Sequence, residues 1–281
     1  MNPISVQGAV VAITGAGGSI GRETAIAMAG AGALVAAGDL DGATARATAE
    51  LIGDHARGYA VDVRSRESME AFLARLTADF GAPPRVFVNN AGVMPLGPFV
   101  PQDLAVIERA IDVNLWGVIH GTQMAARVMI EAGEGHIVNV ASLMGRSVAP
   151  GAAAYGAAKH AAVGLGATVA LELAGTGVSL TTVLPSAVNT PLIDGIDLPG
   201  ILPVVEPYEV AAAILASCRH RRTEVTVPGW MSKVPEIERL LPSKLITALR
   251  KRFGGDAALD SVDAVARADY ENRVRHSELV A

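Results

Sequence analysis

The chain has 281 residues, of which 51% are hydrophobic and 18% are charged, so it can bury a large core and is not an intrinsically disordered protein. Its 23 basic residues face 28 acidic ones, and the resulting net charge of −5 gives no reason to expect a nucleic acid as partner. We therefore expect small molecules and other protein chains as partners. Cys218 is the only cysteine, which excludes an intrachain disulfide and a cysteine-based metal site.

Short apolar runs alternate with longer amphipathic stretches along the chain. We predict buried strands at residues 9–13, 34–37, 59–63, 86–90, 137–141, 178–184 and 225–227. The longer stretches between them, beginning with about 20–31 and 41–52, are predicted helices. Continuous apolar strands that alternate with helices predict a parallel sheet covered on both faces, which is a doubly wound α/β sheet.

Two segments depart from this alternation. Residues 185–206 contain four prolines among apolar residues, and a long apolar loop of this kind is typical of a functional lid or a disordered segment. Residues 231–281 follow the last predicted strand, and their first part places apolar residues at near-helical spacing. We therefore predict one domain over residues 1–230 and a helical C-terminal extension over residues 231–281.

The extension is basic between residues 233 and 253 and has three interpretations. It could pack on its own domain, complete the pocket of a neighbouring subunit, or lie on a membrane surface. Pro242 interrupts the helical pattern, and no tryptophan or tyrosine lies within 233–253, so packing within an oligomer is favoured over membrane contact. No apolar run reaches the roughly 18 residues that cross a bilayer, and residues 1–7 do not resemble a secretory signal, so we expect a cytoplasmic location.

A glycine-rich turn follows the first predicted strand and leads into a helix. Gly15, Gly18 and Gly21 allow the backbone to turn tightly and approach a pyrophosphate. The N–H groups of a helix that begins near Ser19 and Ile20 would then bind the phosphates. A tight structural turn uses the same residues, but the place of this one between strand and helix favours a dinucleotide site.

Asp39 lies at the end of the second predicted strand, 18 residues after Gly21. A carboxylate at this position accepts hydrogen bonds from the adenosine ribose and repels a 2′-phosphate, which predicts NAD rather than NADP. The alternative is structural, because either Asp39 or Asp41 could cap the next helix. Arg22 could likewise touch a phosphate or be a solvated charge on its helix.

Tyr155 and Lys159 are four residues apart, so they share one face of a predicted helix. An ammonium close to a phenol lowers the phenol's pKa, which makes the tyrosine a usable proton donor or acceptor near neutral pH. Ser142 follows the strand at 137–141, and its hydroxyl could hold a carbonyl or alcohol oxygen in the same pocket. The Tyr–Lys spacing is common by chance and gains weight only together with the serine and the phosphate loop.

These motifs occur in the order of the classical short-chain dehydrogenase/reductase family, which residues 6–230 resemble. The resemblance rests on Thr14–Gly21, Asp62–Val63, Asn89–Gly92, Asn114, Ser142, Tyr155 with Lys159, and Pro185 to Thr190. It implies a Rossmann fold, a nicotinamide cofactor, and reversible hydride transfer between a secondary alcohol and a ketone. It also implies a homo-oligomer, a dimer or a tetramer, in which the helix of Tyr155 forms a dimer face.

The resemblance assigns a role to each matching residue. Tyr155 would be the general acid and base, Lys159 would lower its pKa and bind the nicotinamide ribose, and Ser142 would hold the substrate oxygen. Asn114 would support a water that connects Lys159 to solvent. The cofactor would further be held at the adenine end by Asp62 and Val63, at the adenine ribose by Asn90, Ala91 and Gly92, and near the nicotinamide by the segment from Pro185 that includes Val188 and Thr190.

Several of these residues also have structural interpretations. Asn114 could be a polar residue inside a helix, and Thr190 a helix cap, although the functional interpretation is favoured for Asn114. For Asn89, an end-of-strand role is favoured instead. His120, His136 and His160 suggest neither a metal nor a proton relay, and we assign no metal.

Two departures from the family pattern keep other functions open. Ser19 replaces a glycine of the classical loop, and the remaining glycines match the extended branch, which acts on nucleotide sugars. Ser186 replaces the glycine that usually follows Pro185. The favoured prediction is an NAD-dependent enzyme acting on an apolar alcohol or ketone of steroid, terpenoid or fatty type, because Met94, Leu96, Met144 and Val148 are expected near the pocket. The alternatives are an extended-type enzyme acting on a nucleotide sugar and a non-catalytic NAD-sensing regulatory protein.

Overall fold

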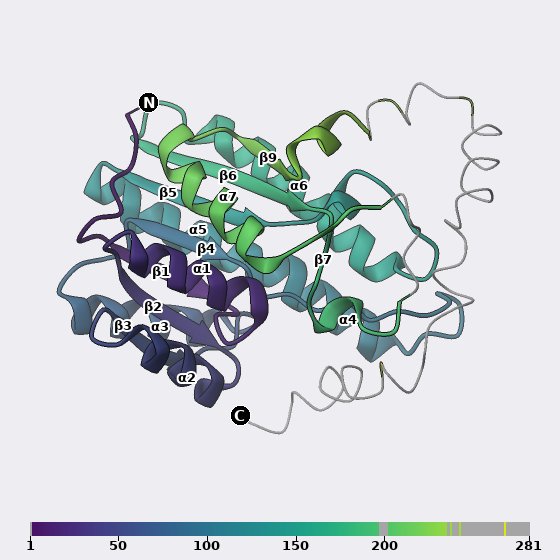
Figure 1. Cartoon of the computed structure of the whole chain (residues 1–281), viewed down its shortest axis with the longest axis horizontal. Helices are drawn as coiled ribbons and strands as arrows, with labels where there is room; N and C mark the ends of the chain where they lie inside the picture. Colours follow the sequence, from purple (N-terminus) through teal and green to yellow (C-terminus); the bar gives the residue numbers. More distant parts are fainter. Residues whose placement is uncertain (1, 197–201, 235–236, 238–241, 243–266, 268–281) are drawn as a thin grey trace.

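The computed structural model describes residues 2–196, 202–234, 237, 242 and 267 of the chain. A parallel sheet of seven strands forms its centre, in the order β3-β2-β1-β4-β5-β6-β9 (Figure 1). The strands are β1 (Val10–Thr14), β2 (Leu34–Asp39), β3 (Ala56–Ala60), β4 (Val86–Asn89), β5 (Gly135–Val140), β6 (Val178–Pro185) and β9 (Glu224–Val227). The predicted doubly wound α/β sheet is therefore confirmed.

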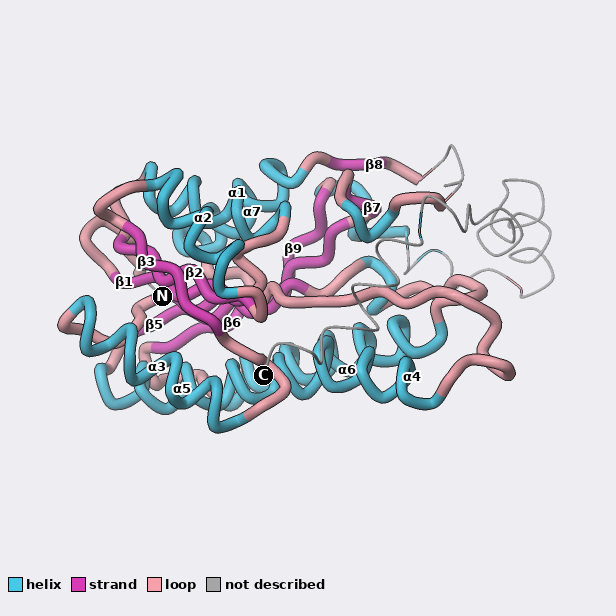
Figure 2. The backbone as a smooth tube through the Cα atoms, turned by 90° about the horizontal axis from the view of Figure 1, so that it is seen from below, coloured by secondary structure: helices cyan, strands magenta, loops and turns pink. Residues whose placement is uncertain are grey.

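Helices cover both faces of the sheet (Figure 2). One layer contains α1 (Ser19–Gly30), α2 (Gly42–Ile52) and α7 (Pro207–His220), and the other contains α3 (Arg66–Phe80), α5 (Gly117–Ala132) and α6 (Ala153–Glu172). The helix α4 (Leu104–Ile111) precedes α5. The chain leaves β1 for β2 on one side and returns to β4 on the other, so the strand order reverses between β1 and β4. In open α/β sheets the crevice beyond the carboxyl ends of the strands at such a reversal is where ligands bind.

The third strand lies earlier in the chain than the sequence predicts. The apolar run predicts a strand at 59–63, whereas β3 covers Ala56–Ala60. As the edge strand, β3 pairs only with β2, and the last pair joins Asp39 to Ala60. Because β2 ends at Asp39, the pairing ends where the N–H of Val61 donates to the carbonyl of Asp39 at 2.8 Å, and Val61 and Val63 are buried in the turn that follows.

The segment predicted as a long apolar loop contains regular structure. It holds β7 (Ala187–Val188), the 3-10 turn η3 (Pro191–Ile193) and β8 (Val204–Val205), and β7 pairs with β8. Ser186, at the departure from the family pattern, donates through its hydroxyl to the carbonyl of Pro203 at 2.7 Å. Residues 197–201 lie outside the described residues, as does most of the predicted helical extension at 231–281.

A buried polar chain fixes the amino ends of β5 and β6. Arg221 Nε donates to Ser179 Oγ at 2.6 Å, Ser179 Oγ lies 2.7 Å from His136 Nδ1, and His136 Nε2 lies 3.0 Å from Ser217 Oγ. Ser217 in turn donates to the carbonyl of Ile214 at 2.6 Å. Burial, with a smaller contribution from the charge of Arg221, lowers the pKa of His136 from 6.5 to about 3. His136 is thus a neutral core residue.

Candidate functional site

The glycine-rich turn between β1 and α1 is closed against the neighbouring loop. Gly15 has a φ of +67°, and a β-carbon there would come within 2.8 Å of the Cα of Ala91. A β-carbon on Gly21 would lie 2.1 Å from the carbonyl oxygen of Gly15. Only glycine fits at these two positions, so the backbone is free to approach a ligand closely.

The first turn of α1 is open to an anion. Gly18 occupies the N-cap position of α1, and no side chain caps the helix there. Ser19 and Ile20 are the first two residues of the helix. Unpaired backbone N–H groups and the positive end of the helix dipole are what a phosphate binds. The guanidinium of Arg22 donates to the carbonyl of Gly17 at 2.8 Å. This bond stabilises the turn, so Arg22 is not simply a solvated charge on its helix.

Asp39 belongs to the phosphate turn, and Asp41 caps the helix. Asp39 Oδ2 accepts from the N–H of Gly17 at 2.9 Å, whereas Asp41 Oδ1 accepts from the N–H of Ala43 at 2.8 Å at the start of α2. Burial raises the pKa of Asp39, and the hydrogen bonds from Gly17 and Asp41 oppose that rise. The sequence left open whether Asp39 or Asp41 caps the next helix. Asp41 is the residue that caps α2.

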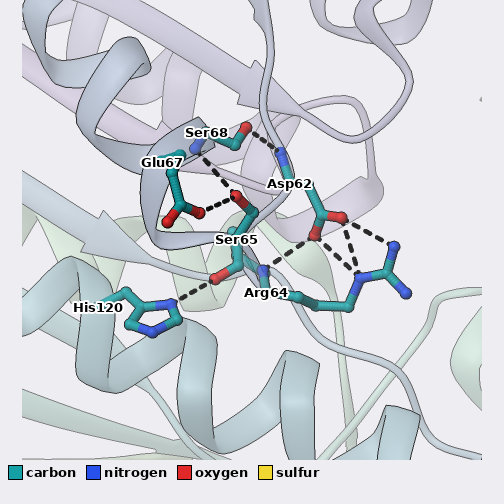
Figure 3. Close-up of polar contacts among 7 residues, drawn as sticks. Asp62, Arg64, Ser65, Glu67, Ser68 and His120 are labelled. Atoms are coloured by element: carbon teal, nitrogen blue, oxygen red, sulfur yellow. Dashed lines mark hydrogen bonds and ion pairs between the residues drawn. The ribbon is translucent and has the colours of Figure 1, made fainter. Parts of the chain in front are cut away.

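The turn after β3 is held by several hydrogen bonds and contains Asp62 and Arg64 (Figure 3). Val63 lies between these two residues. Arg64 donates two hydrogen bonds to the carboxylate of Asp62, from Nε to Oδ1 at 3.0 Å and from Nη2 to Oδ2 at 2.8 Å. The N–H of Asp62 donates to Ser68 Oγ at 2.9 Å. His120 Nδ1, on α5, lies 3.0 Å from the carbonyl oxygen of Val63.

Arg64 and His120 are therefore the partners that the sequence interpretation missed at this turn. His120 contacts a residue 57 positions away, so no local pattern could identify it. Burial raises the pKa of Asp62, but the hydrogen bonds and charge of Arg64 outweigh it and leave that pKa below its ordinary value. Asp62 therefore stays ionised at neutral pH.

Asn90 joins the carboxyl end of β4 to that of β1. Its side-chain Nδ2 donates to the carbonyl oxygens of Thr14 at 3.0 Å and Gly15 at 3.1 Å. The N–H of Ala91 donates to Thr14 Oγ1 at 3.3 Å. These bonds place residues 90–92 beside the phosphate turn, at the reversal of the strand order.

Asn89 has a structural role, as the sequence interpretation favoured. Its Nδ2 donates to Asn139 Oδ1 at 2.8 Å and to Thr122 Oγ1 at 3.2 Å, and all three side chains are buried. The group links β4, β5 and α5 beneath the site.

Tyr155, Ser142 and Lys159 come together at the carboxyl end of β5. Tyr155 and Lys159 lie on α6, and Ser142 directly precedes the 3-10 turn η2 (Leu143–Gly145), which its side chain caps by accepting from the N–H of Met144 at 3.1 Å. Lys159 Nζ lies 5.5 Å from the centre of the Tyr155 ring and donates to the carbonyl of Val140 at 3.0 Å. The three predicted catalytic side chains thus form one group.

The expected lowering of the tyrosine pKa does not occur in this arrangement. Burial raises the pKa of Tyr155 to about 12, and a hydrogen bond with Ser142 opposes that rise. Burial also lowers the pKa of Lys159 to about 8. Desolvation of the phenol is the larger of the two effects on the pKa of Tyr155, and desolvation also accounts for the change at Lys159. At neutral pH the phenol therefore carries its proton.

Asn114 lies in a π-helical turn, η1 (Asp112–Trp116), between α4 and α5. Its Nδ2 donates to the carbonyl oxygens of Val93 at 2.7 Å and Ala110 at 2.8 Å. A β-carbon on Gly92 would lie 2.9 Å from Asn114 Oδ1 and 3.7 Å from Lys159 Nζ, so asparagine and lysine meet at this glycine. Single π-turns inside helices are frequent at functional sites.

An apolar cluster surrounds Tyr155. Its buried members are Met94, Ala152 and Tyr155 itself, and the partly buried residues packed against them are Leu96, Met144, Leu192, Ile193 and Ile196. Met94, Leu96 and Met144, three of the four residues expected near the pocket, therefore belong to this cluster. The fourth, Val148, is 62% exposed. Below, these eight residues are called the Tyr155 cluster.

The segment after β6 contributes Val188 and Thr190. Val188 is buried in β7, and Thr190 Oγ1 accepts from the N–H of Leu192 at 3.3 Å, so Thr190 caps η3. Pro185 ends β6, paired with Val227 of β9. The capping interpretation of Thr190 is confirmed, and the cap fixes where η3 turns toward the Tyr155 cluster.

The described part of the chain contains no group of three or more His, Cys, Asp or Glu side chains suited to a metal ion. Among the same residues, no helix combines the length and apolar character needed to cross a bilayer.

Comparison with known proteins gives three findings on the sequence. Residues 9–197 match the family model for short chain dehydrogenase. The probable oxidoreductase EphD of Mycobacterium tuberculosis is 33% identical over 266 residues, covering 86% of this chain and 45% of EphD. Estradiol 17-beta-dehydrogenase 11 of Mus musculus is 30% identical over 255 residues, covering 89% of this chain and 85% of that protein. The chain thus spans less than half the length of EphD.

A solved structure agrees with the sequence comparison. The crystal structure of 3-ketoacyl-(acyl-carrier-protein) reductase from Brucella melitensis, complexed with NADH, has a TM-score of 0.73 and 29% sequence identity to this chain. The match covers 79% of this chain and 98% of that reductase chain.

Proposed function

This chain belongs to the classical short-chain dehydrogenase/reductase family, and from that premise we propose that it is an NAD-dependent oxidoreductase that interconverts a secondary alcohol and a ketone. The observation that carries the proposal is the single group formed by Ser142, Tyr155 and Lys159 inside the Tyr155 cluster. That group lies at the same end of the sheet as the glycine turn.

The glycine turn and its surroundings fit a dinucleotide. The uncapped start of α1 would hold the pyrophosphate, and the close packing of Gly21 on the carbonyl of Gly15 keeps the turn tight beside that helix end. Asp39 would accept from the adenosine ribose and repel a 2′-phosphate, which supports NAD over NADP. The Asp62–Val63 turn would meet the adenine, and Val188 with Thr190 would lie near the nicotinamide. When bound, the nicotinamide supplies or accepts the hydride.

The residues of this chain handle the proton and the substrate oxygen. Ser142 holds the oxygen by a hydrogen bond, and Tyr155 donates its proton to a ketone oxygen or takes the proton from an alcohol. Burial raises the pKa of Tyr155 to about 12, so at neutral pH the phenol carries the proton that a ketone oxygen would take in the reduction. Lys159, with its pKa lowered to about 8, would pass the proton on, and Asn114 would support a water that connects Lys159 to solvent.

The substrate that fits best is apolar. The Tyr155 cluster surrounds the phenol with aliphatic and thioether side chains. A site of this kind binds a substrate by burying its hydrocarbon surface. A relative named as an estradiol dehydrogenase supports the steroid type among apolar alcohols and ketones.

The test replaces Tyr155 by phenylalanine, which removes the proton donor and keeps the ring. Turnover of 17β-estradiol, menthol and 2-decanol with NAD+, and of their ketones with NADH, is followed by NADH absorbance. We expect Tyr155→Phe to lose at least about a thousandfold in kcat while the Kd for NADH changes less than about twofold. Tyr59→Phe is the matched control, because Tyr59 bonds to Asp79 at the edge of the sheet.

Two results would contradict the proposal. Near-normal turnover by Tyr155→Phe would remove the tyrosine from the chemistry. Saturable NADH binding by the unmodified protein, with no turnover across the panel, would favour a dinucleotide sensor instead. Repeating the assay with NADP+ tests the cofactor preference.

We further propose that the protein is a homo-oligomer that pairs through α6. A cavity of about 320 Å3 opens on the outer face of this helix, lined by Met144, Val148, Ala149, Ala152, Ala153, Gly156, Ala157 and His160. The small side chains on α6 among these residues, at Ala153, Gly156 and Ala157, would allow two helices to approach closely. Light scattering after size exclusion checks the assembly, and Ala157→Arg should shift it toward the monomer.

A further inference from the structure

Arg267, one of the few described residues of the C-terminal extension, is buried against the proposed substrate site. Arg267 is 2% exposed and is one of the largest fully buried side chains among the described residues. Its Nη1 donates to the carbonyl oxygens of Leu192 at 3.0 Å and Asp194 at 3.3 Å. Its Nη2 donates to the carbonyl oxygen of Met94.

The acceptors belong to two separate walls of the Tyr155 cluster. Met94 lies in the segment after β4, whereas Leu192 and Asp194 lie in and directly after η3. Met94 and Leu192 are themselves members of the cluster. One guanidinium thus joins the two walls through their backbones, 173 positions from Met94 in sequence.

The chemistry of arginine suits this task. Its planar guanidinium carries five donors in a fixed fork and stays charged, so it bonds to acceptors in two directions at once. Burying such a charge is costly unless it is hydrogen-bonded, so a buried arginine is held in place by its acceptors. Backbone carbonyls make the contact independent of the side chains at positions 94, 192 and 194.

We propose that Arg267 is a positioning residue that clamps these two walls and thereby sets the shape of the apolar site in which Tyr155 meets its substrate. The proposal rests on the proposed function for the identity of the site, but the clamp itself is a structural claim. Without the clamp, the segment after β4 and the turn η3 separate more easily. The enzyme then holds an apolar substrate less tightly, while the dinucleotide site at α1 is unaffected.

Hydrogen exchange on the full-length chain tests the clamp directly. Several amides of the two walls have acceptors of their own: Gly97 bonds to Gly151, Leu192 to Thr190 Oγ1, and Ile193 to the carbonyl of Thr190. In Arg267→Met we expect these amides to exchange at least about tenfold faster, with α1 unchanged. Unchanged exchange in either wall would overturn the proposal.

Two further variants sharpen the exchange experiment. Arg267→Lys keeps the charge but lacks the planar fork, so its exchange rates should fall between those of the unmodified chain and Arg267→Met. It also serves as the test variant if Arg267→Met does not fold, and rates like those of the unmodified chain would then overturn the clamp. Arg66→Met is the control, because Arg66 forms a surface ion pair with Glu70 on α3.

Kinetics tests the positioning role. With the best substrate of the panel above, Arg267→Met should raise KM at least about tenfold and change kcat and the Kd for NADH by less than about threefold. An unchanged KM despite faster exchange would overturn the positioning role. The two proposals remain distinguishable, because an active Tyr155→Phe would defeat the proposed function and leave the exchange result standing.

Discussion

The buried imidazole of His136 should make the fold sensitive to acid. The pKa of His136 is lowered from 6.5 to about 3, so the folded protein strongly prefers the neutral ring. A group whose folded pKa is depressed contributes stability that is complete above its unfolded pKa and is lost as the pH falls toward the folded pKa. The window here lies between pH 6.5 and about pH 3.

The size of the effect follows from that shift. Each pH unit between the two pKa values costs about 1.4 kcal/mol of the free energy of unfolding, so lowering the pH from 7 to 5 removes about 2 kcal/mol through His136 alone. A proton added at Nδ1 would also have to displace the hydroxyl hydrogen of Ser179, whose oxygen already accepts from Arg221.

The assay is urea unfolding at pH 7 and pH 5, followed by circular dichroism. His136→Gln should be less stable at pH 7, because it breaks a buried chain, but it should lose about 2 kcal/mol less than the unmodified protein on going to pH 5. His55→Gln, at an exposed position, is the control and should retain the full pH dependence. An equal loss in His136→Gln and the unmodified protein would refute the reasoning.

Two further predictions concern the dinucleotide site. Asp39→Asn keeps an oxygen for the N–H of Gly17 but removes the charge, so the preference for NAD over NADP, measured as the ratio of kcat/KM values, should fall at least about tenfold; an unchanged ratio would contradict the role of the carboxylate. Gly21→Ala drives a β-carbon against the carbonyl of Gly15 and should weaken NADH binding at least about tenfold and cost about 1–3 kcal/mol of stability, measured by fluorescence titration and thermal unfolding. Gly30→Ala in the same helix has open space, so it should leave NADH binding unchanged and raise stability by about 0.5–1 kcal/mol.

The sheet could be predicted from the sequence because its strands are continuous apolar runs. Central strands such as β1, with all five residues buried, have no alternative interpretation. The edge strand was misplaced because Tyr59 is the one buried residue of β3, and its register depends on where β2 ends. A pattern within the strand itself does not contain that information.

The candidate site also has a part that local sequence predicts and a part that depends on residues far apart in the chain. Tyr155, Lys159 and Ser142 are recognised from spacing and from their place after a strand, and the structure brings them together. The pKa of the phenol could not be predicted, since it depends on burial by residues distant in sequence. Arg267 could not be predicted at all, because its acceptors lie on two loops far from it along the chain.

The π-turn at Asp112–Trp116 has a consequence for how this helix pair tolerates changes in length. A π-turn accommodates one residue more than an α-helix would, so the carbonyl of Ala110 is satisfied by the side chain of Asn114. Deleting one residue within the turn would leave a regular helix that remains well bonded, yet it would rotate the asparagine by about 100° away from Gly92. A shortening that the fold itself could absorb would thus silence the site, which makes helix length a feature that selection can act on independently of stability.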